Sequence, residues 1–190
     1  MTASQLSEEL IGTIEAVLYG ADEPVSPERL LEVVSAAGHG IAGTDLDLER
    51  VRSACLELEE RYRASGSALQ IVEIARGYRL GTRARFDDAI RILRHVERPT
   101  QLSIPVLETL AVVAYRQPTT IAEIHAIRGK DPVATLRRLR DLRLVRITGR
   151  RRAVGRPFTY GTTDRFLELF GLRDLKELPS EDEFQELLEA

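Results

Sequence analysis

The sequence predicts a mainly α-helical protein with small β wings, built as two tandem winged helix-turn-helix domains. Three observations predict this fold. Apolar residues recur at helical spacing along most of the chain, short β-rich runs follow the third helix of each half, and the same order of elements occurs twice. With 43% hydrophobic and 30% charged residues over 190 positions, the composition is that of an ordinary globular protein.

Three helices are expected in the first half. The first covers residues 8–19. Ser26 and Pro27 start the second, because the serine side chain accepts a hydrogen bond from the first turn and proline needs no donor there. Asp47 caps the third, after a glycine-rich loop at 39–44. The residues expected to face the core are Leu10, Ile14, Val17, Leu30, Leu31, Val34, Leu48, Val51, Cys55, Leu58 and Tyr62.

A β hairpin and a connecting helix are expected next. Residues 69–74 and 78–80 are rich in β-formers and are separated by Arg76 and Gly77, which predicts a tight hairpin. The connecting helix is marked by Phe86, Ile90 and Leu93, and residues 99–101 are expected to join the two domains.

The second half is expected to repeat this order. Pro105 opens a helix that is apolar around its whole circumference, which predicts a central, buried helix. Thr120 and Glu123 form a capping box at the start of the next helix, and Asp131 with Pro132 starts the third. Core positions are expected at Leu107, Leu110, Ala111, Ala114, Ile121, Ile124, Ile127, Val133, Leu136, Leu139 and Leu142, and strand positions at Val145, Ile147, Phe158 and Tyr160.

The two halves also match in detail, which indicates a tandem duplication. Tyr19 precedes a Pro-Val-Ser turn at 24–26, and Tyr115 precedes a Pro-Thr-Thr turn at 118–120. The expected organisation is an N-terminal winged-helix domain at 1–85, a connecting helix and linker at 86–102, a C-terminal winged-helix domain at 103–179 and an acidic tail at 180–190.

The sequence contains no pattern typical of an enzyme, so no catalytic residue, metal or cofactor is expected. The three histidines, His39, His95 and His125, fall in different elements without paired ligands. The single cysteine, Cys55, lies on the apolar seam of its helix, which favours a buried and inert thiol. The absence of a spanning apolar run and of a basic, apolar leader indicates a cytoplasmic protein.

A basic hairpin tip is the strongest local electrostatic feature. Residues 111–163 hold 12 basic and 3 acidic side chains, and four arginines gather at the tip. Such a loop favours weak, non-specific contact with DNA phosphates. A winged-helix transcription regulator that acts through this basic wing is the alternative hypothesis, although the preceding helix has no asparagine or glutamine of the kind that reads bases. The arginines are Arg150, Arg151, Arg152 and Arg156.

The stretch LETLAVVAYRQP, residues 107–118, closely resembles the signature of the segregation and condensation protein B family. The resemblance continues through Glu123-Ile124, Ile127-Arg128-Gly129 and Gly155-Arg156-Pro157, and spans about residues 10–179. The chain departs from the family pattern at Lys130-Asp131-Pro132, where other residues cap the helix, and in its arginine-rich wing.

The resemblance implies a non-enzymatic subunit of the bacterial SMC complex. It implies a homodimer paired mainly through the first domains, and second domains that grip a partly extended segment of the kleisin, segregation and condensation protein A. The kleisin in turn connects the subunit to the SMC ATPase, so a nucleoid-associated role in chromosome condensation and segregation is expected. The residues expected to contact the kleisin are Tyr115, Arg116, Gln117, Pro118, Phe158 and Tyr160.

Overall fold

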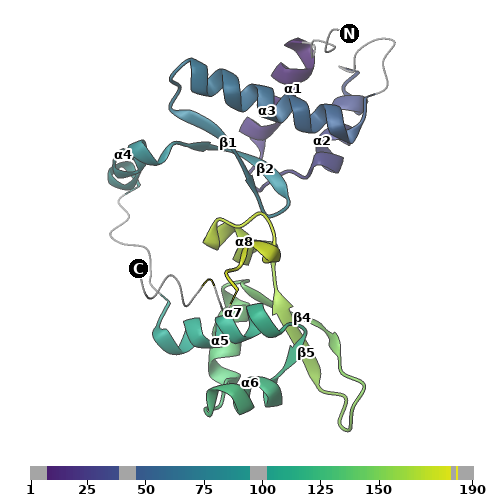
Figure 1. Ribbon diagram of the computed structural model, residues 1–190, viewed down its shortest axis with the longest axis vertical. Helices are drawn as coiled ribbons and strands as arrows, with labels where there is room; N and C mark the ends of the chain where they lie inside the picture. The colour runs from purple at the N-terminus through teal and green to yellow at the C-terminus, as the bar shows by residue number, and fades with distance from the viewer. Residues whose placement is uncertain (1–7, 39–45, 95–101, 181–182, 184–190) are drawn as a thin grey trace. The chain divides into compact units, whose positions relative to one another are not determined.

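The computed structural model describes residues 8–38, 46–94, 102–180 and 183 (Figure 1). The chain divides into two compact units, residues 1–97 and 98–190. The expected connecting helix belongs to the first unit. The expected loop at 39–44, the joint at 99–101, His39 and His95, and nearly all of the acidic tail lie outside the described residues.

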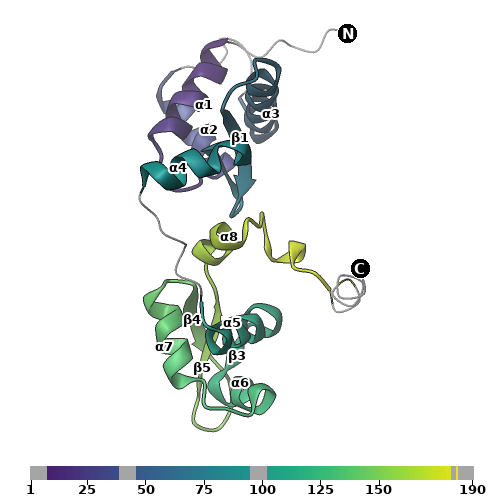
Figure 2. The ribbon, with the colours of Figure 1, turned by 90° about the vertical axis from the view of Figure 1, so that its left-hand side faces the viewer.

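The first unit has three packed helices and a hairpin, as predicted (Figure 2). Ser26 Oγ accepts from the backbone N of Arg29 at 3.2 Å, and Asp47 Oδ1 accepts from that of Arg50 at 2.9 Å, so both expected caps form. The elements are α1 (Glu8–Gly20), α2 (Pro27–Ala36), α3 (Leu48–Ala64), β1 (Leu69–Ile74), β2 (Gly77–Thr82), η1 (Ala84–Phe86) and α4 (Asp87–Leu93).

The core of the first unit lies between α1, α2, α3 and the hairpin. Val17, Leu31 and Tyr62 are only partly buried at its margin, and Leu48 is exposed although we expected it in the seam. Leu48 is the first residue of α3, where the helix has not yet reached the packed layer. The buried side chains are Leu10, Ile11, Ile14, Leu18, Leu30, Val34, Val51, Ala54, Cys55, Leu58 and Tyr78.

The second unit is a winged helix with one extra helix. Its three-stranded antiparallel sheet has the order β3-β5-β4, and a bulge between Ile147 and Gly149 bends the wing strand. Thus the predicted fold class is confirmed. The elements are α5 (Ile104–Arg116), β3 (Thr119–Thr120), α6 (Ile121–Arg128), α7 (Val133–Asp141), β4 (Val145–Arg150), β5 (Phe158–Thr162), α8 (Asp164–Phe170) and η2 (Leu175–Glu177).

The prediction that α5 is buried all round is wrong. Leu110 and Val113 are buried, but Leu107 and Ala111 are exposed. Within this unit α5 packs against α6, α7 and β5 on one side only. The other expected core residues that are exposed are Ile121, Ile127 and Val133.

The predicted repeat is visible in the strand pairing. In the first unit Val25, just before α2, exchanges backbone hydrogen bonds with Tyr78 at 2.8 and 2.9 Å. In the second unit Thr119, just before α6, pairs with Tyr160. Both tyrosines are buried, so in each unit the turn before the second helix is closed by a tyrosine of the hairpin.

Candidate functional site

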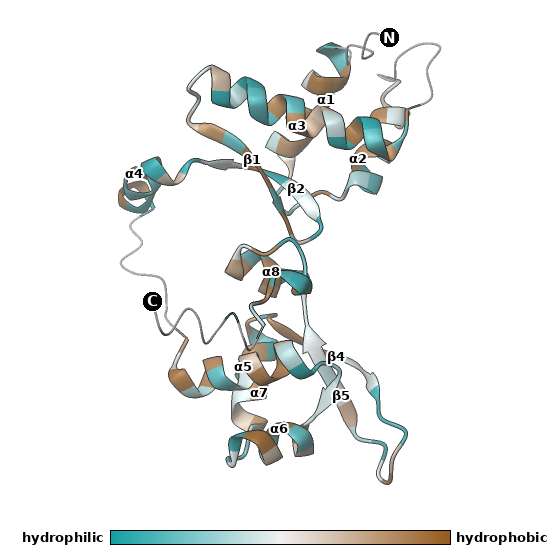
Figure 3. Ribbon diagram, in the orientation of Figure 1, coloured by the Kyte–Doolittle hydropathy of each residue, from teal (hydrophilic) through white to brown (hydrophobic). Residues whose placement is uncertain are grey.

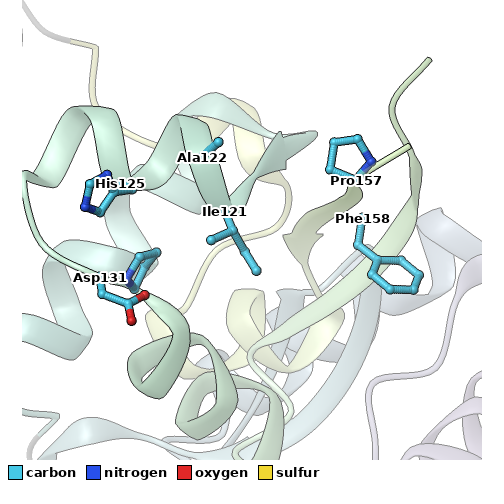
Figure 4. Close-up of a pocket in the computed structure, with 7 residues that line it drawn as sticks. Ile121, Ala122, His125, Asp131, Pro157 and Phe158 are labelled. Atoms are coloured by element: carbon cyan, nitrogen blue, oxygen red, sulfur yellow. The ribbon is translucent and has the colours of Figure 1, made fainter. Parts of the chain in front are cut away.

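An apolar groove of about 510 Å³ lies on the second unit (Figure 4). It is formed by the start of α6, the segment leading into α7 and the start of β5. Phe158 is 41% exposed and Ile121 is 37% exposed, so two large apolar side chains face solvent here. The lining residues are Ile121, Ala122, His125, Asp131, Pro132, Pro157 and Phe158.

Local hydrogen bonds hold the helical walls of this groove. The capping box forms as predicted: Glu123 N donates to Thr120 Oγ1 at 3.3 Å, and Thr120 N donates to Glu123 Oε2 at 2.8 Å. These bonds position Ile121 at the first turn of α6. Asp131 Oδ1 accepts from Val133 N at 3.0 Å and so starts α7.

The Phe158 ring makes a cation–π contact with an arginine. Arg150, its register partner across the wing, places its guanidinium carbon 4.0 Å from the ring centroid. Arg150 Nη1 also donates to the Arg156 carbonyl at 3.2 Å. The groove is therefore apolar inside and positively charged beside Phe158.

Arg151 does not contribute a free charge, in contrast to the sequence expectation for the basic tip. Its Nη2 donates to the Pro118 carbonyl at 2.8 Å and to Glu123 Oε2 at 2.9 Å. Hydrogen bonds from Thr120, together with the charge of Arg151, lower the pKa of Glu123, so the carboxylate stays ionised near neutral pH. Arg151 thus ties the wing to the turn before α6.

Other arginines near the wing are exposed and have no ion-pair partner among the described residues. Arg152 and Arg156 occupy the hairpin tip. Arg137 and Arg138 are exposed on α7. Of the tip arginines, Arg151 alone is paired with a carboxylate in the described part of the chain.

Two of the six residues expected to contact a partner are held by contacts within the unit: Tyr160 is buried and Gln117 is half-buried. Tyr160 is 6% exposed and belongs to the packed sheet. The Gln117 amide links α5 to β5: its Oε1 accepts from Thr162 N at 2.8 Å, and its Nε2 donates to the Ala114 carbonyl at 3.2 Å. We therefore leave both residues out of the candidate surface.

The remaining expected residues are accessible. Tyr115 is half exposed, and its hydroxyl donates to the Pro179 carbonyl at 2.8 Å. Arg116 and Pro118 are exposed on the turn that leads into α6. From the sequence, none of Ala122, Asp131 and Pro157 is expected at a binding surface: Asp131 is marked only as a helix start and Pro157 only as part of the family resemblance.

Within the described ranges, no group of three or more His, Cys, Asp or Glu side chains is arranged to hold a metal ion. None of the described helices is long and apolar enough to cross a membrane. Cys55 is buried, and burial raises the pKa of its thiol to about 12.

Comparison with known proteins places these observations in a family. Residues 12–181 match the family model described as segregation and condensation complex subunit ScpB. Segregation and condensation protein B of Syntrophotalea carbinolica is 45% identical over 94% of this chain and 85% of its own length. The protein of the same name from Moorella thermoacetica is 42% identical over 91% of this chain and 83% of its own. The crystal structure of ScpB from Mycobacterium tuberculosis is 32% identical, covers 90% of this chain and 99% of its own, and has a TM-score of 0.39.

Proposed function

Because this chain belongs to the segregation and condensation complex subunit ScpB family, we propose that it is a non-enzymatic subunit of a bacterial SMC–kleisin complex. In this role the protein binds the kleisin, segregation and condensation protein A, and through it the SMC ATPase. It acts in the cytoplasm, at the nucleoid, and supports chromosome condensation and segregation without a reaction of its own.

The exposed groove beside Phe158 carries the proposal for kleisin binding. Exposed aromatic groups in apolar clefts are typical anchors of protein interfaces. An extended kleisin segment would place an apolar side chain between Ile121 and Phe158, and an acidic side chain of that segment would complement Arg150. Tyr115, Arg116 and Pro118, which precede α6 in the chain, extend this contact surface.

The test is titration of the central kleisin segment of the same organism into the full chain, followed by calorimetry. Phe158→Ala and Ile121→Ala are each expected to weaken binding tenfold or more, because truncated anchors typically cost 2 kcal/mol or more. Leu169→Ala is the control, since Leu169 is also an exposed large apolar residue but lies on α8, outside the groove. If both groove variants bind as the wild type does while Leu169→Ala weakens binding, the groove is not the site.

We further propose that the protein is a homodimer paired through its first unit. The first unit exposes several large apolar side chains that a second copy would cover. These are Tyr19, Leu48, Leu56, Ile92 and Leu93.

DNA contact is a second candidate function, and the unpaired arginines of α7 and the wing tip favour it. Guanidinium groups without carboxylate partners suit phosphate oxygens, which supply most non-specific DNA affinity. α7 carries no asparagine or glutamine, so recognition of a sequence by a transcription regulator is disfavoured. We propose weak, backbone-directed contact within the assembled complex.

A further inference from the structure

The outer face of α5 carries an apolar stripe that the described part of the chain leaves exposed. Its residues are three or four apart in the sequence, so they share one side of the helix, opposite the buried Val113. The hydropathy colouring shows brown on several turns of this helix (Figure 3). The α5 stripe consists of Ile104, Leu107, Ala111 and Tyr115, all of which are exposed.

The acidic tail begins at one end of the α5 stripe. The Tyr115 hydroxyl donates to the Pro179 carbonyl at 2.8 Å, so the chain returns to the last turn of α5 just before the tail starts. Arg116, the next residue of α5, is exposed and has no carboxylate partner among the described residues. Residues 181–182 are both acidic, so the charge at the start of the tail complements that arginine.

The first residues of the tail carry a helix start. Ser180 and Glu183 form a capping box: Glu183 N donates to Ser180 Oγ at 3.3 Å, and Ser180 N donates to Glu183 Oε2 at 2.7 Å. Glu183 is itself helical. The same reciprocal pair opens α6, at Thr120 and Glu123. Since a capping box satisfies the backbone donors at the start of a helix, we expect the helix to continue beyond Glu183.

The sequence of the tail has one apolar side. Phe184, Leu187 and Leu188 follow the i, i+3, i+4 spacing of a helical face. A helix over 180–188 would be about 12 Å long, which is also the length of the α5 stripe over 107–115. Because a helix this short is unstable alone in water, its apolar side needs a surface to pack against.

We propose that residues 183–189 form a helix that packs antiparallel on the α5 stripe and competes there with the kleisin. The tail helix starts beside the C-terminal end of α5, so its positive end lies near the negative end of the α5 dipole. The competition rests on the proposed function, because Tyr115 belongs to the proposed kleisin surface. The tail thereby shields the stripe from water until the partner replaces it.

The antiparallel direction opposes large side chains to small ones. Counting back along α5 from Tyr115, Phe184 falls near Ala111 and Leu188 falls near Leu107. An aromatic ring over an alanine lets the two helices approach closely. Gln185 is rotated by about 100° from Phe184 around the helix, towards solvent. This neighbour therefore provides a matched control position.

A single tryptophan tests the packing in the full chain without the partner. The chain contains no tryptophan, so Leu107→Trp places one reporter on the α5 stripe. We expect blue-shifted emission, which Phe184→Glu should move towards that of an exposed tryptophan. Gln185→Glu adds the same charge on the other side of the tail and should leave the emission unchanged. Equal emission from the three chains, or an equal shift from both tail variants, would overturn the packing.

Calorimetric titration of the central kleisin segment tests the competition. A surface that is covered in most molecules binds more weakly by the inverse of its free fraction, so Phe184→Glu is expected to bind about three- to tenfold more tightly than the wild type. Gln185→Glu should bind as the wild type does. An unchanged or weaker affinity of Phe184→Glu would overturn the competition.

The two measurements separate this proposal from the proposed function. If neither the wild type nor Phe184→Glu binds the kleisin segment, the proposed function and the competition both fall. The tryptophan emission then still decides whether the tail packs on the α5 stripe, because it is measured without the kleisin.

Discussion

Arg128 on α6 donates from Nη1 to the hydroxyl Oγ1 of Thr109 on α5, across 2.7 Å. The Arg128 side chain is only 5% exposed, and its Nη2 reaches Glu108 at 2.7 Å. Thr109 Oγ1 also lies 2.9 Å from Thr135 Oγ1 of α7. One buried guanidinium thus joins α6 to α5, and the Thr109 hydroxyl extends the link to α7.

Replacing Arg128 is expected to destabilise the second unit. Arg128→Ala removes a buried charged hydrogen bond and leaves a cavity, so the free energy of unfolding should fall by about 2–3 kcal/mol. Arg128→Lys keeps the charge but lacks the forked guanidinium that reaches both partners, so it should retain only part of the stability that Arg128→Ala loses. Urea denaturation measures both. An alanine variant as stable as the wild type would contradict this role.

Two glycines of β2 test the backbone pairing of Val25 with Tyr78, because one lies against Val25 and the other does not. A Cβ on Gly77 would lie 2.8 Å from the backbone C and O atoms of Val25, whereas a Cβ on Gly81 would meet no heavy atom within 4 Å. Gly77→Ala is therefore expected to cost about 1–3 kcal/mol of stability, because backbone cannot move aside cheaply. Gly81→Ala should be close to neutral. Thermal denaturation of the two variants would show equal losses if the Val25 contact were unimportant.

The thiol of Cys55 is expected to be unreactive in the folded protein. Its pKa of about 12 leaves almost no thiolate at pH 8, and the side chain is buried. A thiol reagent should react with this single cysteine only as fast as the first unit opens, and at once in denaturant. Rapid reaction under native conditions would show that Cys55 is accessible.

Glu123 gives the second unit a pH-dependent stability. Its folded pKa lies below the unfolded value of about 4.5, chiefly because its carboxylate accepts from the backbone N–H of Thr120. The stabilisation of the second unit by ionised Glu123 is therefore fully present above the unfolded pKa and is lost as the pH falls through the folded pKa. Glu123→Gln keeps a capping side chain but has no charge. The wild type should be the more stable protein at pH 7, and its advantage should shrink below pH 4. A stability difference between the wild type and Glu123→Gln that does not change with pH would contradict this role of the Glu123 carboxylate.

Arginines of α7 and the wing that have no carboxylate partner are expected to contribute more to DNA binding than Arg151, which is paired with Glu123. Removing Arg137 and Arg138, or Arg152 and Arg156, is expected to weaken binding of a random duplex and to lower the salt slope by up to about one per arginine. Arg151→Ala is the control from the same loop, because Glu123 already neutralises that side chain. Anisotropy titrations at several salt concentrations measure the slope. Equal effects from all five positions would mean that ion pairing does not decide which arginines bind.

Local signals predicted the fold well, because each lies within a few residues. Ser26, Asp47 and the Thr120–Glu123 box cap helices where the sequence places them. Burial was harder to predict. Ile121, Ile124 and Ile127 are three apart, so successive side chains drift by about 60° around the helix, and only the middle one is buried.

The site was less predictable than the fold because its contacts join distant positions. The sequence suggests that Gln117 belongs to an exposed turn, but its amide is hydrogen-bonded to Thr162, 45 residues later. The sequence suggests that Arg151 is an unpaired charge at the hairpin tip, but it pairs with Glu123, 28 residues earlier. Periodicity indicates that a helix has an apolar face, and it does not indicate whether the unit supplies a neighbour to cover it.

The bond from the Tyr115 hydroxyl to the Pro179 carbonyl has a practical consequence for labelling. It brings the chain after α8 back to the end of α5, so whatever follows Pro179 starts beside the proposed kleisin surface. An environment-sensitive fluorophore attached at Ser180 would then report docking as a change in emission, with every contact residue left intact. A bulky affinity tag at the same place would obstruct the partner instead.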